Sequence, residues 1–337
     1  MNRKAHFAVL LLSVLSFATP IRANELVPVQ YSSLGGATDA GVYLADALGF
    51  FKEQGIAVTT NLMTTVPSQI AEMATGRLDV SGIALSPGIF AASARNIGLR
   101  IVGDKQSLRP GFSSTRILVR PDLMKATEEE TVRALRGKRM AGPGRTTIGF
   151  YLVASLFRKY GMDVGDFDFV EIPLPDIVAG LASGAADGAL VVEPIGSRAV
   201  KAGVATELSD CAEFVPPGGS VTPLVYSEQF AQKRELATGF MKAYMRGARV
   251  FVDAFAKGRD RENVIAVIAE HAKIPVDVVR NAFPGGLDPN QRISIAFLDK
   301  VQRFYIEQKL LEKPVDLDRL VDMSFADTAL KELGIYE

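Results

Sequence analysis

Two ten-residue segments of the chain share one frame at an offset of 108 positions, and this repeat limits the possible folds more than any other feature. Residues 70–79 are Ile-Ala-Glu-Met-Ala-Thr-Gly-Arg-Leu-Asp, and residues 178–187 are Val-Ala-Gly-Leu-Ala-Ser-Gly-Ala-Ala-Asp. Each pattern is typical of a helix that stops at glycine, followed by an apolar strand and a helix begun by Pro87 or Pro194. Such passages can coincide by chance, but the matching context on both sides favours a repeat. The repeat predicts two lobes of similar construction.

Short β-rich segments alternate with helical patterns between residues 27 and 200. The predicted strands are 27–31, 56–62, 80–85, 99–102, 115–119, 139–141, 167–172 and 188–192. This alternation predicts an α/β fold in which each lobe is a mostly parallel sheet with helices on both faces. Residues 223–337 are mainly helical and carry two aromatic stripes, which predict core-facing helices packed on the first lobe. The stripes are Phe240, Tyr244, Phe251 and Phe255, and then Ile293, Phe297, Val301 and Phe304.

Residues 1–23 have the features of a cleavable secretory signal. Arg3 and Lys4 precede a 12-residue apolar run at 7–18. That run is shorter than the roughly 20 residues that span a bilayer. Ala23 offers a small residue for cleavage. Because no cysteine follows the run, a lipid anchor is excluded, and we expect a periplasmic protein that is not anchored in a membrane.

Charge and composition exclude several classes of function. The chain has 38 basic and 38 acidic residues; the leader holds three basic residues and no acid, so 35 − 38 = −3 remains. No local basic run indicates nucleic-acid binding. The single cysteine, Cys211, excludes a disulfide within the chain, and His271 is the only histidine outside the leader. We expect His271 on a helix surface, and we expect no metal, no cofactor and no enzymatic activity.

Several motifs carry a family resemblance. They are Leu-Gly-Phe-Phe at 48–51, Gly-Ile-Ala-Val at 55–58, and Ser-Gly-Ala-Ala-Asp-Gly-Ala-Leu-Val-Val-Glu-Pro at 183–194. Together with the leader, they resemble the periplasmic solute-binding proteins of ABC importers, in the branch that handles alkanesulfonates, taurine, nitrate and thiamine-precursor pyrimidines. The resemblance implies the type 2 fold: two lobes joined by two crossover strands, which close over a small-molecule ligand. It also implies a monomer that docks on the transmembrane subunits of an ABC permease, divided into 24–115 (first lobe), 116–222 (second lobe) and 223–337 (first lobe).

The candidate ligand site lies at four strand-to-helix junctions, 32–39, 86–87, 142–147 and 193–194. In open α/β sheets, ligands bind beyond the carboxyl ends of strands, and helix starts there offer N–H donors to anions. The candidate ligand-binding residues are Ser33, Gly35, Gly36, Thr38, Tyr43, Ser86, Arg145, Thr146, Thr147 and Glu193, with Arg116 as a weaker candidate near the first crossover.

Three candidates have two interpretations each. Arg145 either pairs with a sulfonate or carboxylate or is a solvated loop residue. Tyr43 packs either on the ligand or on the core. Glu193 beside an anion would be costly, so its contact would favour a ligand with N–H or O–H donors, such as a pyrimidine.

The first functional hypothesis is a solute-binding protein for a small organic anion of sulfonate or carboxylate type. The alternatives are the same fold binding a neutral pyrimidine or aromatic solute, and an exported sensor that docks on a receptor. An exported hydrolase is disfavoured because no nucleophile motif accompanies His271. A pyrimidine-forming enzyme of the thiamine pathway is similar in architecture, but it uses a cysteine-rich motif that this chain lacks.

Overall fold

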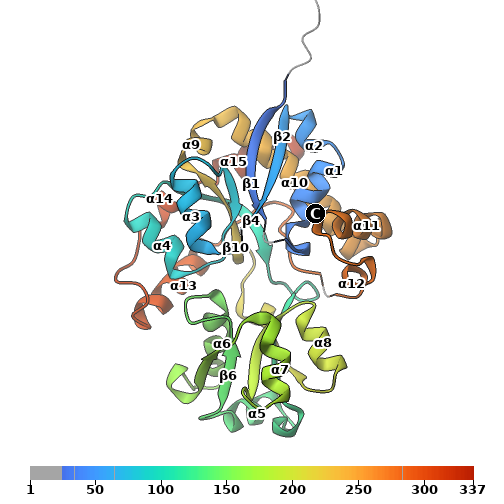
Figure 1. The fold of residues 1–337 in the computed structure, drawn as a ribbon. Helices are drawn as coiled ribbons and strands as arrows, with labels where there is room; N and C mark the ends of the chain where they lie inside the picture. The colour runs from blue at the N-terminus through green and yellow to red at the C-terminus, as the bar shows by residue number, and fades with distance from the viewer. Residues whose placement is uncertain (1–24, 34, 64, 283) are drawn as a thin grey trace, which may run out of the picture.

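The computed structural model describes residues 25–33, 35–63, 65–282 and 284–337. The predicted leader, 1–23, lies outside the described residues. The chain folds into two lobes, one above the other; the upper lobe holds both ends of the described chain and the lower lobe its middle (Figure 1). Among the described residues, no helix is long and apolar enough to cross a membrane.

The upper, first lobe is built on a five-stranded sheet of order β2-β1-β3-β10-β4. Its strands are β1 (Val27–Ser33), β2 (Ile56–Leu62), β3 (Val80–Gly82), β4 (Leu99–Ser107) and β10 (Ser220–Ser227). β1 is parallel to β2 and β3, whereas β10 is antiparallel to β3 and β4. Four of the five strands therefore run in one direction.

The lower, second lobe repeats this arrangement with the order β7-β6-β8-β5-β9. Its strands are β5 (Thr115–Val119), β6 (Arg139–Gly142), β7 (Asp168–Glu171), β8 (Gly188–Val192) and β9 (Thr206–Asp210). β6 is parallel to β7 and β8, and β5 is antiparallel to β8 and β9. The predicted pair of mostly parallel sheets is confirmed, with one reversed strand in each.

Helices cover both faces of the sheets, as the alternation of side chains shows. In β10, Leu224 and Tyr226 join the apolar core around α10, while Val225 between them joins the core around α4 and α13. The helices are α1 (Ala40–Ala47), α2 (Phe50–Glu53), α3 (Val66–Ala74), α4 (Pro87–Ala94), α5 (Glu128–Ala134), α6 (Ile148–Lys159), α7 (Ile177–Ala182), α8 (Ile195–Lys201), α9 (Glu228–Gln232), α10 (Arg234–Lys257), α11 (Arg261–Ala272), α12 (Val276–Asn281), α13 (Ile295–Glu307), α14 (Leu317–Leu320) and α15 (Ser324–Leu333).

The internal repeat is a structural repeat. Asp79 donates its N–H to the carbonyl of Gln30 in β1 (3.0 Å), and its carboxylate accepts the Gln30 N–H (2.9 Å). Asp187 makes the same two bonds with Arg139 in β6, at 2.8 and 2.9 Å. The shared aspartate of the repeat thus ties each helix stop to the equivalent strand of its lobe, β1 or β6, because an aspartate can accept a strand amide that the sheet leaves free.

The two lobes face each other with the carboxyl ends of their strands. β4 leads through 108–114 into β5, so its carboxyl end points to the second lobe, and β1, β2 and β3 run the same way. β9 leads back through 211–219 into β10, so β6, β7 and β8 end toward the first lobe. The predicted division at 115/116 and 222/223 stays a prediction; Thr115 pairs within the second sheet, and residues 220–222 pair within the first.

The C-terminal helices differ from expectation at one place. α10 packs on α1 in the first lobe, as predicted, and Phe240, Tyr244 and Phe251 are buried there. α13 instead lies between the lobes: Phe304 approaches Tyr151 of α6, with ring centroids 5.4 Å apart, and contacts between α13 and α4 lie on its other side (Figure 1). An aromatic stripe predicts that a helix face is buried, but not which lobe covers it.

Candidate functional site

Ser33 ends β1, and its hydroxyl has no hydrogen-bonding capacity left. Ser33 Oγ donates to Asp39 Oδ2 (2.6 Å) and accepts the N–H of Gly35 (2.8 Å). Tyr43 Oη lies 3.1 Å from the same oxygen. Since the single Ser33 proton goes to the carboxylate, Tyr43 must donate to Ser33. Ser33 therefore shapes the loop after β1, and Tyr43 Oη retains only acceptor capacity.

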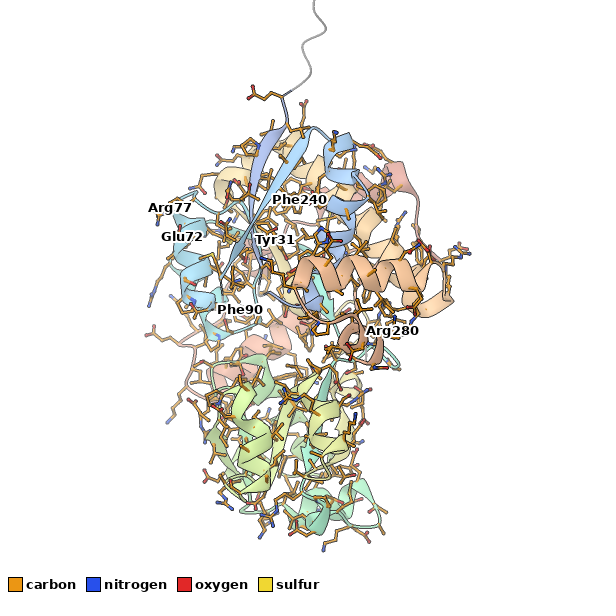
Figure 2. All side chains as sticks on the ribbon, turned by 45° about the vertical axis from the view of Figure 1, so that its right-hand side comes forward. Tyr31, Glu72, Arg77, Phe90, Phe240 and Arg280 are labelled. Atoms are coloured by element: carbon orange, nitrogen blue, oxygen red, sulfur yellow. The ribbon has the colours of Figure 1, made fainter. Side chains whose placement is uncertain are left out.

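Asp39, just before α1, is the centre of a buried polar cluster. Its carboxylate accepts the hydroxyl of Tyr31 (2.5 Å) as well as that of Ser33, and Lys105 Nζ of β4 lies 3.1 Å from Oδ1. The Lys105 ammonium also donates to Thr38 Oγ1 (2.9 Å). Tyr31 lies inside the first lobe in Figure 2, and burial, with the Asp39 charge, raises its pKa well above the usual range.

Tyr43 packs on protein, and its partner was not expected. The Tyr43 and His271 ring centroids are 5.5 Å apart, and His271 Nδ1 lies 2.9 Å from the carbonyl oxygen of Val267. Burial raises the pKa of Tyr43. His271 lies on helix α11, as expected, but its ring is half-buried against the helix that follows the β1 loop rather than fully exposed.

Ser86, before α4, has a buried hydroxyl with no hydrogen-bond partner among the described residues. The chain between β3 and Ser86 stays beside β10, where the Leu85 N–H donates to the carbonyl of Val221 (3.0 Å). Tyr151 of α6 also buries an unpartnered hydroxyl. Tyr305 of α13 donates to the Leu85 carbonyl (3.1 Å), and burial together with Tyr151 raises its pKa. Orphaned buried hydroxyls are costly, so they mark a place where a bound molecule would be stabilised.

The sequence analysis missed Tyr151 and Tyr305. Both were hidden within apolar helical patterns, where a tyrosine is indistinguishable from a core residue.

The loop 142–147 lies at the end of β6, beside a carboxylate of β7 that was not predicted. Glu171 of β7 accepts the Arg145 N–H at 3.0 Å. The Arg145 guanidinium lies over the rings of Phe150 and Phe169, 5.0 and 5.7 Å from their centroids. Thr146 is exposed, and the side chain of Thr147 donates to Gly144 (2.8 Å). Arg145 is thus exposed but held against an aromatic surface at the start of α6.

The side chain of Glu193, which follows β8, points toward the start of the next helix, α8. Its carboxylate accepts the Ser197 N–H (3.3 Å), and its N–H donates to Ser114 (2.8 Å). Both candidate junctions of the second lobe, 142–147 and 193–194, therefore already face a carboxylate, Glu171 or Glu193. In the first lobe the Gly35 backbone has φ +77°, a left-handed turn, and Gly36 is extended.

Arg116, the weaker candidate, lies directly after the first crossover, as expected. It lies in β5 and forms ion pairs with Asp210 (2.6 Å) and Glu207 (3.4 Å) of the neighbouring strand. Its guanidinium is thus engaged within the second sheet. No cluster of three or more histidine, cysteine or acidic side chains suited to a metal ion occurs in the described part of the chain.

Two α/β lobes with this strand order, joined by two crossovers and facing each other with the carboxyl ends of their strands, form the type 2 periplasmic binding protein fold. The chain belongs to the NMT1/THI5-like family, which it matches over residues 37–254. It is 26% identical over 245 residues to the taurine-binding periplasmic protein of Escherichia coli (strain K12), covering 72% of this chain and 71% of that one.

Solved structures share the fold. The periplasmic aliphatic sulphonate binding protein SsuA of Escherichia coli superposes with a TM-score of 0.69 at 20% identity, covering 88% of this chain and 91% of that one. The periplasmic nitrate-binding protein NrtA of Synechocystis PCC 6803 has a TM-score of 0.72 at 14% identity, covering 93% and 90%.

One similar structure is an enzyme. The desulfurization enzyme DSZB has a TM-score of 0.60 at 18% identity, covering 91% of this chain and 99% of that one. The fold therefore does not by itself decide between binding and catalysis. Cys211, the single cysteine, is buried just after β9, and burial raises the pKa of its thiol well above the usual value. This is the opposite of the lowered pKa that makes a cysteine nucleophilic.

Proposed function

We propose that this chain is the periplasmic ligand-capturing component of an ABC importer and binds a small organic anion of sulfonate or carboxylate type between its lobes. The observation that carries the proposal is the orphaned Ser86 hydroxyl at the start of α4, on the edge of the first lobe that faces the second. A sulfonate or carboxylate oxygen would accept this hydroxyl, and the positive end of the α4 dipole would favour its negative charge. The taurine-binding and sulphonate-binding relatives support the same ligand class.

The remaining candidates take different parts in this proposal. Thr38, Gly35 and Gly36 border the first-lobe side, and Arg145, Thr146 and Thr147 border the second-lobe side. Ser33 and Tyr43 support the loop rather than supply protons, because their protons are already committed. The chain would act as a monomer, without enzymatic activity, after removal of residues 1–23.

Capture would proceed by closure of the lobes about the segments 108–114 and 211–219. A ligand that contacts both lobes stabilises only the closed form, so it shifts the population toward closure. Small-angle scattering with saturating ligand should show a smaller radius of gyration than ligand-free protein. An unchanged radius would exclude closure as the binding step.

The carboxylates of Glu171 and Glu193 favour a second candidate, a ligand that also carries N–H or O–H donors, such as a pyrimidine. Calorimetry with taurine, ethanesulfonate, nitrate and uracil separates the two candidates. Binding of taurine or ethanesulfonate supports the first, and binding of nitrate alone would replace the organic anion with an inorganic one. Binding of uracil alone supports the second, and mass spectrometry of the molecule released on denaturation identifies a co-purified ligand. Binding of none of them, with nothing co-purified, would refute the proposal. An adjacent permease gene distinguishes transport from the sensor alternative.

A further inference from the structure

Lys105 reaches the candidate site from β4 without touching its surface. Its side chain is 1% exposed and crosses β3 at Gly82, where a Cβ would come within 2.6 Å of Lys105 Cδ. The glycine therefore makes room for the lysine stem. At the far end, the ammonium meets Asp39 and Thr38 at the carboxyl end of β1. Asp39 and Thr38, which precede Lys105 by 66 and 67 positions in the sequence, thus meet its ammonium beneath the loop that precedes α1.

The protons of this cluster can be assigned from its chemistry. An ammonium only donates and a carboxylate only accepts, so the oxygen of Thr38 accepts from Lys105. The single Thr38 proton must then point toward another acceptor. Among the described residues no hydrogen bond provides one, and Thr38 is half-buried at the rim of the loop. Its hydroxyl is therefore left as a donor for an incoming molecule.

The charges of the cluster cancel close to that donor. Asp39 faces Lys105 at 3.1 Å and also accepts the hydroxyls of Tyr31 and Ser33. Without the ammonium, a buried carboxylate would lie beside Thr38 and would repel an anion. Lys105 thus performs two tasks at a distance: it fixes the direction of the Thr38 proton, and it offsets the Asp39 charge.

We propose that Lys105 is a positioning residue that directs the single Thr38 proton away from itself and toward the ligand, so that the first-lobe half of the site donates a hydrogen bond to anionic oxygen. The ligand class rests on the function proposed above, whereas the proton assignment does not. Thr38 is the residue that touches the ligand, and Lys105 acts through it. This ranks Thr38 above Ser33 and Tyr43 as the side-chain hydrogen-bond donor of the β1 loop.

Calorimetry of four variants with taurine, ethanesulfonate and nitrate tests the coupling. Thr38→Val should weaken whichever anion binds by about 10-fold or more, because a hydrogen bond to a charged group is lost. Thr38→Ser should stay within about 3-fold. In the Asp39→Asn/Lys105→Met background, which keeps the cluster neutral, Thr38→Val should cost less than about 3-fold. The matched control is Thr60→Val, an exposed threonine of β2 in the same lobe.

An equal loss for Thr38→Val in both backgrounds, or no loss in the wild type, would overturn the proposal. Neutron diffraction of ligand-free, deuterium-exchanged crystals gives a second readout that does not depend on ligand. We expect three deuterons on Lys105 Nζ and a Thr38 deuteron directed away from it. A Thr38 deuteron directed at Lys105, or a two-deuteron amine, would refute the assignment. If no anion binds the wild type, the proposed function fails, and the neutron map alone decides this inference.

Discussion

Asp104 is a buried carboxyl at the point where both connections between the lobes leave the first sheet. It lies in β4, and its Oδ1 accepts the hydroxyl of Ser220, the first residue of β10, at 2.6 Å. Its Oδ2 accepts the N–H of Asp288 at 2.7 Å. Burial is the largest influence and raises the pKa of Asp104 from 3.8 to about 7, while these hydrogen bonds act in the opposite direction.

The sign of the effect on stability follows from proton binding. Between pH 3.8 and about 7, the folded chain holds a proton on Asp104 that the unfolded chain has released. The free energy of unfolding contributed by this group therefore falls as pH rises through that window. A shift of roughly three pKa units corresponds to about 4 kcal/mol in total, of which about 3 kcal/mol is lost between pH 5 and pH 8.

Asp104→Asn should remove this dependence while it preserves the local bonds. The Asn oxygen can accept the Asp288 N–H, and its amide can donate to Ser220, whose hydroxyl can donate to the Gln106 carbonyl 3.2 Å away. Urea unfolding followed by circular dichroism should show the variant gaining about 3 kcal/mol relative to wild type between pH 5 and pH 8. Asp277→Asn, an exposed acid of α12, is the control and should show no such gain. A constant difference between Asp104→Asn and wild type at the two pH values would refute the reasoning.

Three further predictions concern single side chains. Arg145→Ala should weaken anion binding by about 10-fold or more in calorimetry, because a charged hydrogen bond is lost, whereas the exposed Arg133→Ala should leave it unchanged. Glu171→Gln should strengthen anion binding by about 2- to 5-fold, since it removes a negative charge at the start of α6; weaker binding would contradict this. Tyr305→Phe should lower the free energy of unfolding by about 1–3 kcal/mol in urea titrations, because the Leu85 carbonyl loses its donor; an unchanged midpoint would show that this carbonyl finds another donor.

Local patterns were sufficient to predict the architecture. The repeat at 70–79 and 178–187 predicted two similar lobes, and the equivalent bonds of Asp79 and Asp187 confirm it. A helix that ends at glycine, a helix that begins at proline and a strand with an apolar run each depend on residues close together in the chain. The sequence therefore shows these features directly. The same reasoning placed all four junctions at strand ends that face the other lobe.

The chemistry of the site depended on distant residues and could not be predicted in the same way. Lys105 reaches Asp39 only because β4, β3 and β1 lie in one sheet and Gly82 leaves space for its stem. The Glu171 contact with Arg145 likewise requires the register of β7 against β6. The Glu193 contact with Ser197 spans only four residues, so the spacing of a carboxylate before a short helix could have indicated it.

The position of α13 predicts how the lobes can move. The centroid of its Phe304 ring lies 5.4 Å from the ring centroids of both Phe150 and Tyr151 of α6. The Tyr305 hydroxyl donates a hydrogen bond to the Leu85 carbonyl of the first lobe. Separating α6 from α13 would expose these buried rings to water at a cost of about 1.5–3 kcal/mol for each side chain. On the other side of the molecule, α8 and α12 (Figure 1) belong to separate core clusters among the described residues, so opening there separates no cluster that those two helices share.

We therefore expect closure to pivot on the α6–α13 contact. Hydrogen exchange should show added protection at 35–39 and 193–197 when ligand binds, and unchanged exchange along α13. A ligand-dependent change along α13 as large as that at 35–39 would place the pivot elsewhere, because a contact that is kept in both states cannot alter its exposure.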